Sequence, residues 1–280
     1  MFLHLEHVSK SFGQTSSGVL DVLQDIDLEV EKGEFVSIVG PSGCGKSTLL
    51  YLISGLEQSS QGRILKNGRP VTAPGPDRVV VFQEAGLFPW LTVLDNITYG
   101  LRCIGTPKKE AREKGLEMLR TVHLSRYVHA YPHQLSGGMK QRVAIARALV
   151  MEPDVLLMDE PFAALDEQTR IVLHHELLNI WRKTQVTILF VTHNIREAVQ
   201  LSERILVMGT RPGHMKAELR VPTARDGIAP DSVTLYYEQQ IITLLKEEIE
   251  QVVKEEMGDD YCFEAHPLYR DVSGDLGSHT

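Results

Sequence analysis

The chain has 280 residues, 42% of them hydrophobic and 24% charged, with three cysteines and a formal net charge of −8. This length supplies ample core for one large domain or two smaller ones. The acidic balance does not indicate a broad basic surface for nucleic acid. Because Cys44, Cys103 and Cys262 are few and scattered, neither a disulfide framework nor a zinc site is predicted, which suits a reducing cytosol.

No secretory or membrane-spanning segment is predicted. Polar residues interrupt the apolar ones directly after Met1, so the start does not resemble a signal peptide. Nowhere does an apolar run approach the roughly 20 residues that span a bilayer. If the protein works at a membrane, we expect other chains to supply the membrane-spanning part.

Three strands are predicted in the first 39 residues. Short alternations of apolar and polar residues indicate half-buried strands at Leu3 to Val8 and at Ile26 to Val30. A turn from Glu31 to Glu34 then leads into the apolar run Phe35 to Val39, which is typical of a buried strand.

The segment after the third strand matches the phosphate-binding pattern G-x-x-x-x-G-K-[ST], and an apolar run from Leu49 indicates that a helix starts near Thr48. Glycines let consecutive backbone N–H groups turn toward an anion, and the helix N-terminus adds partial positive charge. We expect Lys46 to reach the β- and γ-phosphates and Ser47 to ligate Mg²⁺, with Cys44 as inert packing. The predicted nucleotide-binding residues of this loop are Gly40, Pro41, Ser42, Gly43, Cys44, Gly45, Lys46, Ser47 and Thr48.

Strand signals continue beyond this helix. Arg63 to Val71, with Asn67-Gly68 at its centre, predicts a hairpin with a type I′ turn. Pro74 to Asp77 is predicted as a loop and Arg78 to Gln83 as a further strand. Strands on both sides of the phosphate loop predict a small antiparallel layer attached to the core.

From about Thr92 to Val150 the apolar period is helical. Thr92, with Asp95 three residues on, is predicted to cap one helix, and Pro107 is predicted at the first position of the next. Strands and helices then alternate, which predicts a mainly parallel, doubly wound sheet with its site at the C-terminal ends of the strands. The predicted strands are Val155 to Glu160, Val186 to Thr192 and Arg204 to Met208, and the predicted helices run from about Gln168 to Lys183 and from Ile195.

A second glycine-rich signal lies at Leu135 to Arg142. Ser136 is predicted to cap a helix, and Gly137 and Gly138 leave its first N–H groups open to an anion. Alone, Ser-Gly-Gly is typical of an ordinary capped helix. Its position between the phosphate loop and an apolar strand that ends in two acids favours a second phosphate-facing helix end.

Together these motifs resemble the ATP-binding subunits of ABC transporters over about residues 2 to 215. The resemblance implies a P-loop NTPase core with a mainly parallel sheet, an antiparallel β subdomain and an α-helical signature subdomain at about residues 90–150. It implies an ATP-binding domain over residues 1–230 that hydrolyses ATP with Mg²⁺. It further implies a head-to-tail homodimer, in which each ATP is bound by the phosphate loop of one subunit and the signature of the other.

The resemblance also implies a role for each matching residue. Glu160 matches the catalytic carboxylate, His193 the switch histidine, and Gln83 the Q-loop glutamine, which contacts Mg²⁺ and the attacking water. The implied catalytic residues are Glu160, His193, Gln83 and Lys46, and the implied Mg²⁺ residues are Ser47, Gln83 and Asp159. Beyond the phosphate loop, the implied nucleotide-binding residues are Phe12 on the adenine, Gln83, Ser136, Gly137 and Gly138 of the signature, and Asp166 of the D-loop.

The segment after Gln83 is too apolar for an exposed loop unless something covers it; its apolar residues are Leu87, Phe88, Trp90 and Leu91. Local core is one interpretation, and a groove for a short coupling helix of a membrane subunit is the other. With Met139 and the run Phe162 to Ala164, the segment looks like the nitrate/sulfonate/taurine class of bacterial importers. That class implies permease subunits, a periplasmic or lipoprotein solute-binding protein, and a peripheral location at the cytoplasmic face of the membrane.

One residue departs from the family pattern, and two other functions stay open. Asn194 stands where the family usually has an acid, so we expect weaker contacts between subunits there. A soluble ABC ATPase acting on nucleic acid or ribosomes is one alternative. The gap of about ninety residues between the glycine-rich motifs holds no heptad run, however, and the chain has one cassette. A non-catalytic nucleotide sensor is disfavoured by Lys46, Glu160 and His193.

Beyond about Gly213 the family motifs stop. Apolar residues at four-residue spacing predict an amphipathic helix of about Ser232 to Met257, as a C-terminal element over residues 231–257. These residues are Tyr237, Ile241, Leu245, Ile249 and Val253. We expect the helix to pack on its own cassette rather than to form a partner or regulatory surface. Residues 258–280 are polar and are predicted to be a flexible tail.

Overall fold

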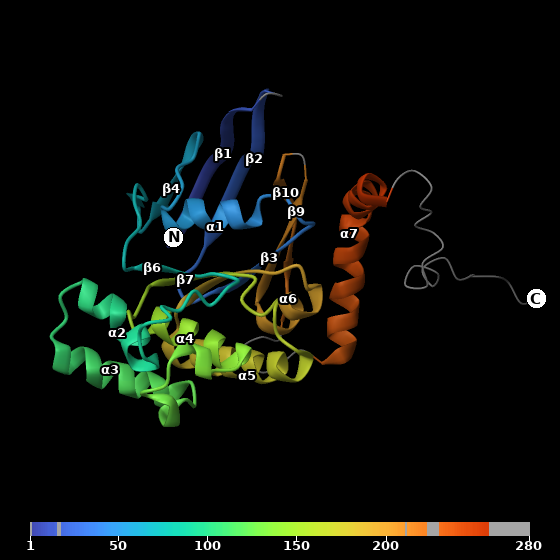
Figure 1. The fold of residues 1–280 in the computed structure, drawn as a ribbon. Coiled ribbons are helices and arrows are strands. Elements are labelled where there is room, and N and C mark those ends of the chain that lie inside the picture. Colours follow the sequence, from blue (N-terminus) through green and yellow to red (C-terminus); the bar gives the residue numbers. More distant parts are fainter. Residues whose placement is uncertain (1, 16–17, 211, 223–229, 258–280) are drawn as a thin grey trace, which may run out of the picture.

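The fold consists of two β-sheets with helices packed on them (Figure 1). It is seen in a computed structural model that describes residues 2–15, 18–210, 212–222 and 230–257. The predicted tail at residues 258–280 lies outside the described residues. Among the helices of the described part, none is long and apolar enough to cross a membrane.

The central sheet has the strand order β10-β9-β3-β8-β7-β6. Its strands are β3 (Phe35–Val39), β6 (Arg78–Val81), β7 (Val155–Asp159), β8 (Thr187–Val191), β9 (Arg204–Gly209) and β10 (His214–Arg220). All neighbours pair in parallel except β10, which runs antiparallel to β9. Because parallel strands end at one edge, the segments that follow β3, β6, β7 and β8 lie together there.

The second sheet is antiparallel, with the order β2-β1-β4-β5. Its strands are β1 (Leu3–Thr15), β2 (Gly18–Val30), β4 (Gln61–Lys66) and β5 (Arg69–Pro70). Lys66 pairs with Arg69 across the predicted two-residue turn, in which Asn67 has a φ of 50° and Gly68 a φ of 73°. Positive φ at both positions is the type I′ geometry, so this turn is confirmed.

The helices cover both faces of the central sheet (Figure 1). They are α1 (Lys46–Ser54), α2 (Val93–Cys103), α3 (Lys108–Thr121), α4 (Gly137–Leu149), α5 (Glu167–Thr184), α6 (Ile195–Leu201) and α7 (Asp231–Met257), with 3₁₀ turns at Ser125–Tyr127 and Pro132–Gln134. Alternation of side chains along each strand divides the core in two. Leu157 and Leu189 face α1 and the antiparallel sheet, whereas Met158 and Phe190 face the layer of α2, α4 and α5.

Several element boundaries differ from those predicted. β1 extends to Thr15 and β2 begins at Gly18, because the distal parts of the two strands pair with each other beyond the predicted segments. β6 ends at Val81, two residues before Gln83, where its pairing with β7 ends. Pro107 is the N-cap of α3 rather than its first residue, with an extended ψ of 140°. β10 was not predicted, because it is a partly exposed edge strand with little apolar character.

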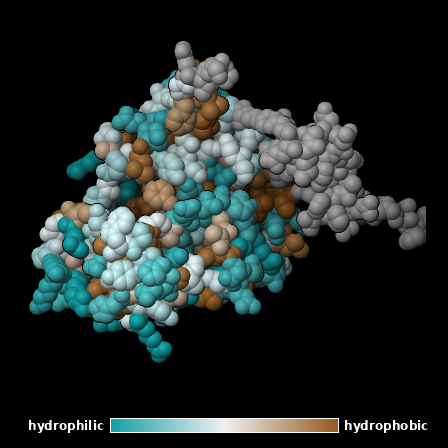
Figure 2. Space-filling view, in the orientation of Figure 1, coloured by the Kyte–Doolittle hydropathy of each residue, from teal (hydrophilic) through white to brown (hydrophobic). Residues whose placement is uncertain are grey.

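Exposed apolar side chains gather at the far end of the β1–β2 hairpin, seen as brown atoms beside the grey ones at the top of Figure 2. Val19 is 61% and Leu20 55% exposed, and Leu20 pairs with Phe12 across the two strands. Nearer the core, Leu23 of β2 is buried. Exposed apolar residues of β2 thus lie beyond the point where the strand joins the core.

The helix α7 packs on its own cassette, as expected. Ile241 and Leu245 are buried against α6 and β9, and Tyr237 packs beside them. Glu248 of α7 accepts hydrogen bonds from Lys216 Nζ of β10 at 2.7 and 2.8 Å. The side chains of Ile249 and Val253 lie outside the described residues, so the apolar stripe is followed only as far as Leu245.

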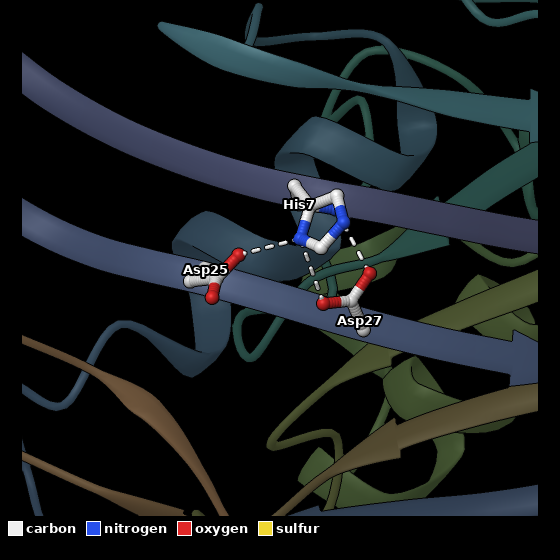
Figure 3. A group of neighbouring side chains, drawn as sticks. All are labelled: His7, Asp25 and Asp27. Atoms are coloured by element: carbon white, nitrogen blue, oxygen red, sulfur yellow. Dashed lines mark hydrogen bonds and ion pairs between the residues drawn. The ribbon is translucent and has the colours of Figure 1, made fainter.

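A charged cluster lies on the β1–β2 hairpin, away from the core (Figure 3). His7 Nδ1 lies 2.8 Å from Asp25 Oδ1 and 3.2 Å from Asp27 Oδ2. His7 and Asp25 both have a φ of 49°, and the register of the two strands shifts beside them. The hydrogen bond with Asp25, and then the charge of Asp27, raises the pKa of the His7 imidazole above its usual value of 6.5.

This pKa shift predicts a pH-dependent stability. A group whose pKa is raised by folding stabilises the folded state fully below its unfolded pKa, and this contribution is lost as pH rises through the folded pKa. The melting temperature of wild type should therefore exceed that of His7→Gln most at about pH 5.5, and the difference should shrink above the folded pKa. Thermal unfolding of both chains across this range checks it. An NMR titration midpoint of His7 at or below 6.5 would refute the shift.

Candidate nucleotide site

The phosphate loop is held between β3 and α1 by close backbone packing. Gly45 has a φ of 94° and caps α1, and a Cβ built on it would stand 2.6 Å from Leu23 Cδ2 of β2. A side chain at position 45 is therefore strained by the positive φ, and it would also require Leu23 to move. α1 begins at Lys46, two residues earlier than predicted, so its free N-terminal N–H groups belong to the loop itself.

Lys46 lies over the loop with its ammonium group turned back onto the backbone. Its side chain is buried, and Nζ donates hydrogen bonds to the carbonyl oxygens of Gly40 at 2.9 Å and Pro41 at 2.8 Å. Cys44 Sγ lies 3.9 Å from the same nitrogen, and burial raises the pKa of the Cys44 thiol. The thiol therefore stays neutral beside Lys46, which agrees with its expected packing role.

Ser47 and Asp159 meet at the C-terminal edge of the central sheet. Ser47 Oγ donates a hydrogen bond to Asp159 Oδ1 at 2.8 Å, and Tyr51 Oη donates to Asp159 Oδ2 at 3.0 Å. The Asp159 carboxylate is buried, and both of these donors are neutral hydroxyl groups. A buried carboxylate beside a hydroxyl offers the oxygen ligands that Mg²⁺ prefers.

Glu160 and His193 lie together one residue beyond β7 and two beyond β8. Glu160 Oε2 is 2.8 Å from His193 Nδ1, and the Glu160 N–H donates to the carbonyl of Val191 at 2.9 Å. Glu160 has a φ of 44°, a left-handed conformation that non-glycine residues rarely adopt and that is frequent at functional sites. His193 is 59% exposed and therefore open to a ligand from solvent.

Gln83 and Phe12 flank this edge on exposed segments. Val81 of β6 pairs with Met158 of β7, so Gln83, two residues on, leaves the sheet beside Glu160. Phe12 is 39% exposed, and Lys10 Nζ lies 4.6 Å from its ring centroid. Lys10 in turn pairs with Leu23, the residue that packs on Gly45. The aromatic ring thus lies on the hairpin that adjoins the phosphate loop.

The second glycine-rich motif begins α4. Ser136 is its N-cap, and Ser136 Oγ accepts a hydrogen bond from the Met139 N–H at 3.3 Å, as predicted. A Cβ on Gly138 would stand 2.4 Å from Thr169 Cγ2 of α5, so a side chain at this position would require Thr169 to move. Asp166 caps α5 by accepting from the Thr169 N–H at 2.9 Å, and this bond lowers the pKa of the Asp166 carboxyl.

Comparison with known proteins decides the family. Residues 23–163 match the family model described as "ABC transporter". The chain is 45% identical over 234 residues to the "Nitrate import ATP-binding protein NrtD" of Synechocystis, covering 84% of this chain and 88% of that protein. The chain belongs to the ABC transporter family. It is 46% identical to the "Aliphatic sulfonates import ATP-binding protein SsuB" of Bacillus cereus, over 80% of this chain and 89% of that one.

A solved structure of the same fold bears on activity. The dimeric, post-hydrolysis structure of the ATP-binding cassette MJ0796, bound to ADP and Pi, aligns with a TM-score of 0.69 and 33% identity. It covers 78% of this chain and 98% of that chain. The predicted fold class is confirmed, and this cassette is an ATP-binding ATPase.

Two polar residues of the cassette were missed from the sequence. Tyr51 bonds Asp159 from one helical turn beyond Ser47, and the i, i+4 spacing on α1 was the available signal. Burial and the neighbouring Asp159 charge raise the pKa of the Tyr51 phenol, so it remains a proton donor. Arg147 of α4 donates to the carbonyls of Ala85 at 2.9 Å and Gly86 at 2.8 Å, and thereby fixes the loop after Gln83.

Proposed function

We propose that this cassette is the ATP-hydrolysing subunit of an importer for a small solute of the nitrate, sulfonate or taurine class. It would act as a head-to-tail homodimer on separate permease subunits at the cytoplasmic face of the membrane. The observation that carries this proposal is the juxtaposition, at one sheet edge, of the Ser47–Asp159 and Glu160–His193 pairs, each at 2.8 Å. The importer class is supported by the relatives that are named for nitrate and aliphatic sulfonate import.

The site residues have distinct proposed roles in phosphoryl transfer, which depends on positioning and on stabilisation of charge. Lys46 and the loop N–H groups hold the β- and γ-phosphates. For this, Lys46 Nζ gives up its hydrogen bonds to the carbonyls of Gly40 and Pro41 and donates to the phosphates instead. Glu160 orients and deprotonates the attacking water, and His193 holds the γ-phosphate in register with Glu160. Phe12 stacks on the adenine, and Gln83 contacts Mg²⁺ and the attacking water.

The donor set at the Ser47–Asp159 pair fits Mg²⁺. Ser47 and Asp159, with Gln83 beside them, would hold the ion through oxygen atoms. When bound, Mg²⁺ supplies positive charge that neutralises charge developing on the phosphate oxygens. Tyr51 keeps the Asp159 carboxylate oriented toward Ser47 by occupying its other oxygen.

The layering of the fold supports a site shared between two subunits. α1, which follows the phosphate loop, packs on one face of the central sheet, whereas α4, which carries Ser136, packs in the layer on the other. The two glycine-rich helix ends thus belong to different layers of one chain. Head-to-tail pairing lets Ser136, Gly137 and Gly138 of one subunit complete the nucleotide site of the other, with Asp166 at the contact between them.

The proposed permease contact lies on the helical layer. Leu87 packs into the core, whereas Trp90 is 70% exposed. Phe88 links Trp90 and Tyr99, with ring centroids 5.6 and 4.6 Å away. Leu87 thus fits the interpretation as local core, and Trp90 fits the interpretation as a contact surface. An exposed aromatic cluster formed by the segment before α2 and by Tyr99 of α2 suits an apolar coupling helix.

Loss of Trp90 should uncouple the cassette from its permease. Removing a central aromatic anchor costs about 2 kcal/mol, or about thirtyfold in affinity. Trp90→Ala should therefore bind the permease at least tenfold more weakly, while the ATPase rate of the isolated cassette stays within about twofold. Pull-down titration with detergent-solubilised permease measures this. Tyr236→Ala is the matched control, since Tyr236 is a 56% exposed aromatic on α7. Equal affinity of Trp90→Ala and wild type would refute this surface.

Reconstitution tests the importer function as a whole. The cassette, its permease and its binding protein are placed in liposomes, and ATPase rate and uptake are measured against a panel of nitrate, sulfonates and taurine. We expect one solute, delivered by the binding protein, to raise the ATPase rate and to accumulate. Stimulation by DNA or ribosomes in place of any solute would favour the soluble alternative.

A further inference from the structure

A buried polar network lies behind the catalytic edge, centred on Glu197 of α6. The Glu197 side chain is 6% exposed, and the network joins it to α5 and to the turn that carries His193. The same network reaches the turn before Asp166. None of the family motifs in the sequence includes Glu197.

The first half of the network fixes the switch turn. Thr192 Oγ1 donates a hydrogen bond to Glu197 Oε2 at 2.8 Å and accepts one from the Asn194 N–H at 3.0 Å. Asn194 Oδ1 accepts from the Glu197 N–H at 3.2 Å and so caps α6. His193 lies between these two anchored residues. Its ring therefore projects toward Glu160 from a turn clamped on both sides.

The second half reaches the turn after Glu160. Glu197 Oε1 lies 3.2 Å from Arg170 Nε and 3.4 Å from His174 Nε2, both on α5. Arg170 Nη2 donates to the carbonyl of Leu165 at 2.9 Å, directly before Asp166. The His174 ring packs against Phe162, whose side chain is fully buried two residues after Glu160. The Glu197 carboxylate thus links the turn that carries His193 to the turn that follows Glu160, and the side chains of these two residues contact each other.

We infer that Glu197 is a positioning residue for ATP hydrolysis, which holds the turns carrying His193 and Glu160 at a fixed separation. This inference rests on the proposed roles of those two residues. A buried carboxylate that accepts a hydrogen bond from the Thr192 hydroxyl and lies 3.2 Å from Arg170 Nε and 3.4 Å from His174 Nε2 is a rigid link, because its two oxygens contact partners in different directions. Small displacements of catalytic groups cost rate far more than affinity, since binding of the nucleotide depends on the phosphate loop.

The experiment measures ATPase kinetics and ATP affinity in full-length variants. Glu197→Gln keeps the shape and removes the negative charge that pairs with Arg170. We expect its kcat to fall about tenfold or more, while ATP affinity stays within about twofold. Thr192→Val, which removes only the hydroxyl link, should lower kcat in the same way. Thr192→Ser keeps the hydroxyl and should keep the wild-type kcat. Glu34→Gln is the control, because Glu34 pairs with buried Arg204 (Oε1 to Nε, 2.8 Å) at the opposite edge of the sheet.

A double-variant cycle separates positioning from general destabilisation. If Glu197 acts through His193, adding Glu197→Gln to His193→Ala should lower kcat less than twofold further. An undiminished tenfold loss in that background, or an equal loss in Glu34→Gln, would overturn the inference. Should Glu197→Gln prove unstable, Thr192→Val with the Thr192→Ser rescue decides the question alone. A His193→Ala variant of wild-type rate would instead refute the proposed role of His193, which is a separate outcome.

Discussion

Replacing Glu160 with glutamine is expected to lower the ATPase rate by about two to four orders of magnitude. In the wild-type chain the Glu160 carboxylate lies 2.8 Å from His193 Nδ1. Glutamine keeps the size of the side chain and can keep this contact, but it cannot accept a proton from water. ATP binding should persist, because Lys46 and the loop N–H groups are unchanged. Steady-state hydrolysis and equilibrium binding of ATP with Mg²⁺ measure the two quantities separately.

The control for this prediction is a carboxylate that lies away from the site. Glu152 is 73% exposed and pairs with Lys114, so Glu152→Gln makes the same chemical change on the surface. Its ATPase rate should stay within about twofold of wild type, as for most exposed substitutions. A Glu160→Gln variant that hydrolyses ATP at a near wild-type rate would remove Glu160 from the role of base.

Ser136→Arg is expected to lower the ATPase rate by at least about a hundredfold. The ATP affinity of a single chain should stay within about threefold of wild type. The long cationic side chain would occupy the helix end that the partner's nucleotide should contact. Within its own chain, position 136 begins α4, in the layer opposite α1, so the phosphate loop is untouched. Binding at low protein concentration and hydrolysis at high concentration distinguish these two effects.

Loss of the helix cap must be separated from loss of the shared site, since an N-cap is worth about 1 kcal/mol. Thr92→Arg supplies this comparison, because Thr92 Oγ1 caps α2 through the Asp95 N–H at 3.1 Å, as Ser136 caps α4. Thr92→Arg should lower stability similarly and leave the ATPase rate of the isolated cassette within about twofold. Wild-type hydrolysis by Ser136→Arg would contradict a site shared between subunits.

The sequence predicted the parts of the site that depend on local patterns. The loop around Lys46, the capped start at Ser136 and the acidic end of β7 each follow from a few neighbouring residues, and the parallel order explains why they share an edge. Local patterns of this kind are predictive because backbone conformation and burial favour the same residue types at these positions. Fold class and family are accordingly predictable from the sequence alone.

Contacts between distant segments were not predictable in the same way. The link from Glu197 to Arg170 spans α5 and α6, and neither residue stands out in a solvated helical pattern. β10 pairs at an edge, where apolar alternation is weak. Tyr51 looked like one more apolar residue of α1 until its hydroxyl met Asp159. In each case the tertiary partner, rather than the local sequence, gives the residue its role.

Shared sites require that two copies of the chain associate when hydrolysis is blocked. Light scattering on Glu160→Gln with ATP and Mg²⁺ tests this most directly. We expect a mass of twice the 31.4 kDa of one chain, which returns to the mass of a single chain when Ser136→Arg is added. A Glu160→Gln chain that binds ATP at saturation yet keeps the mass of one chain would contradict it.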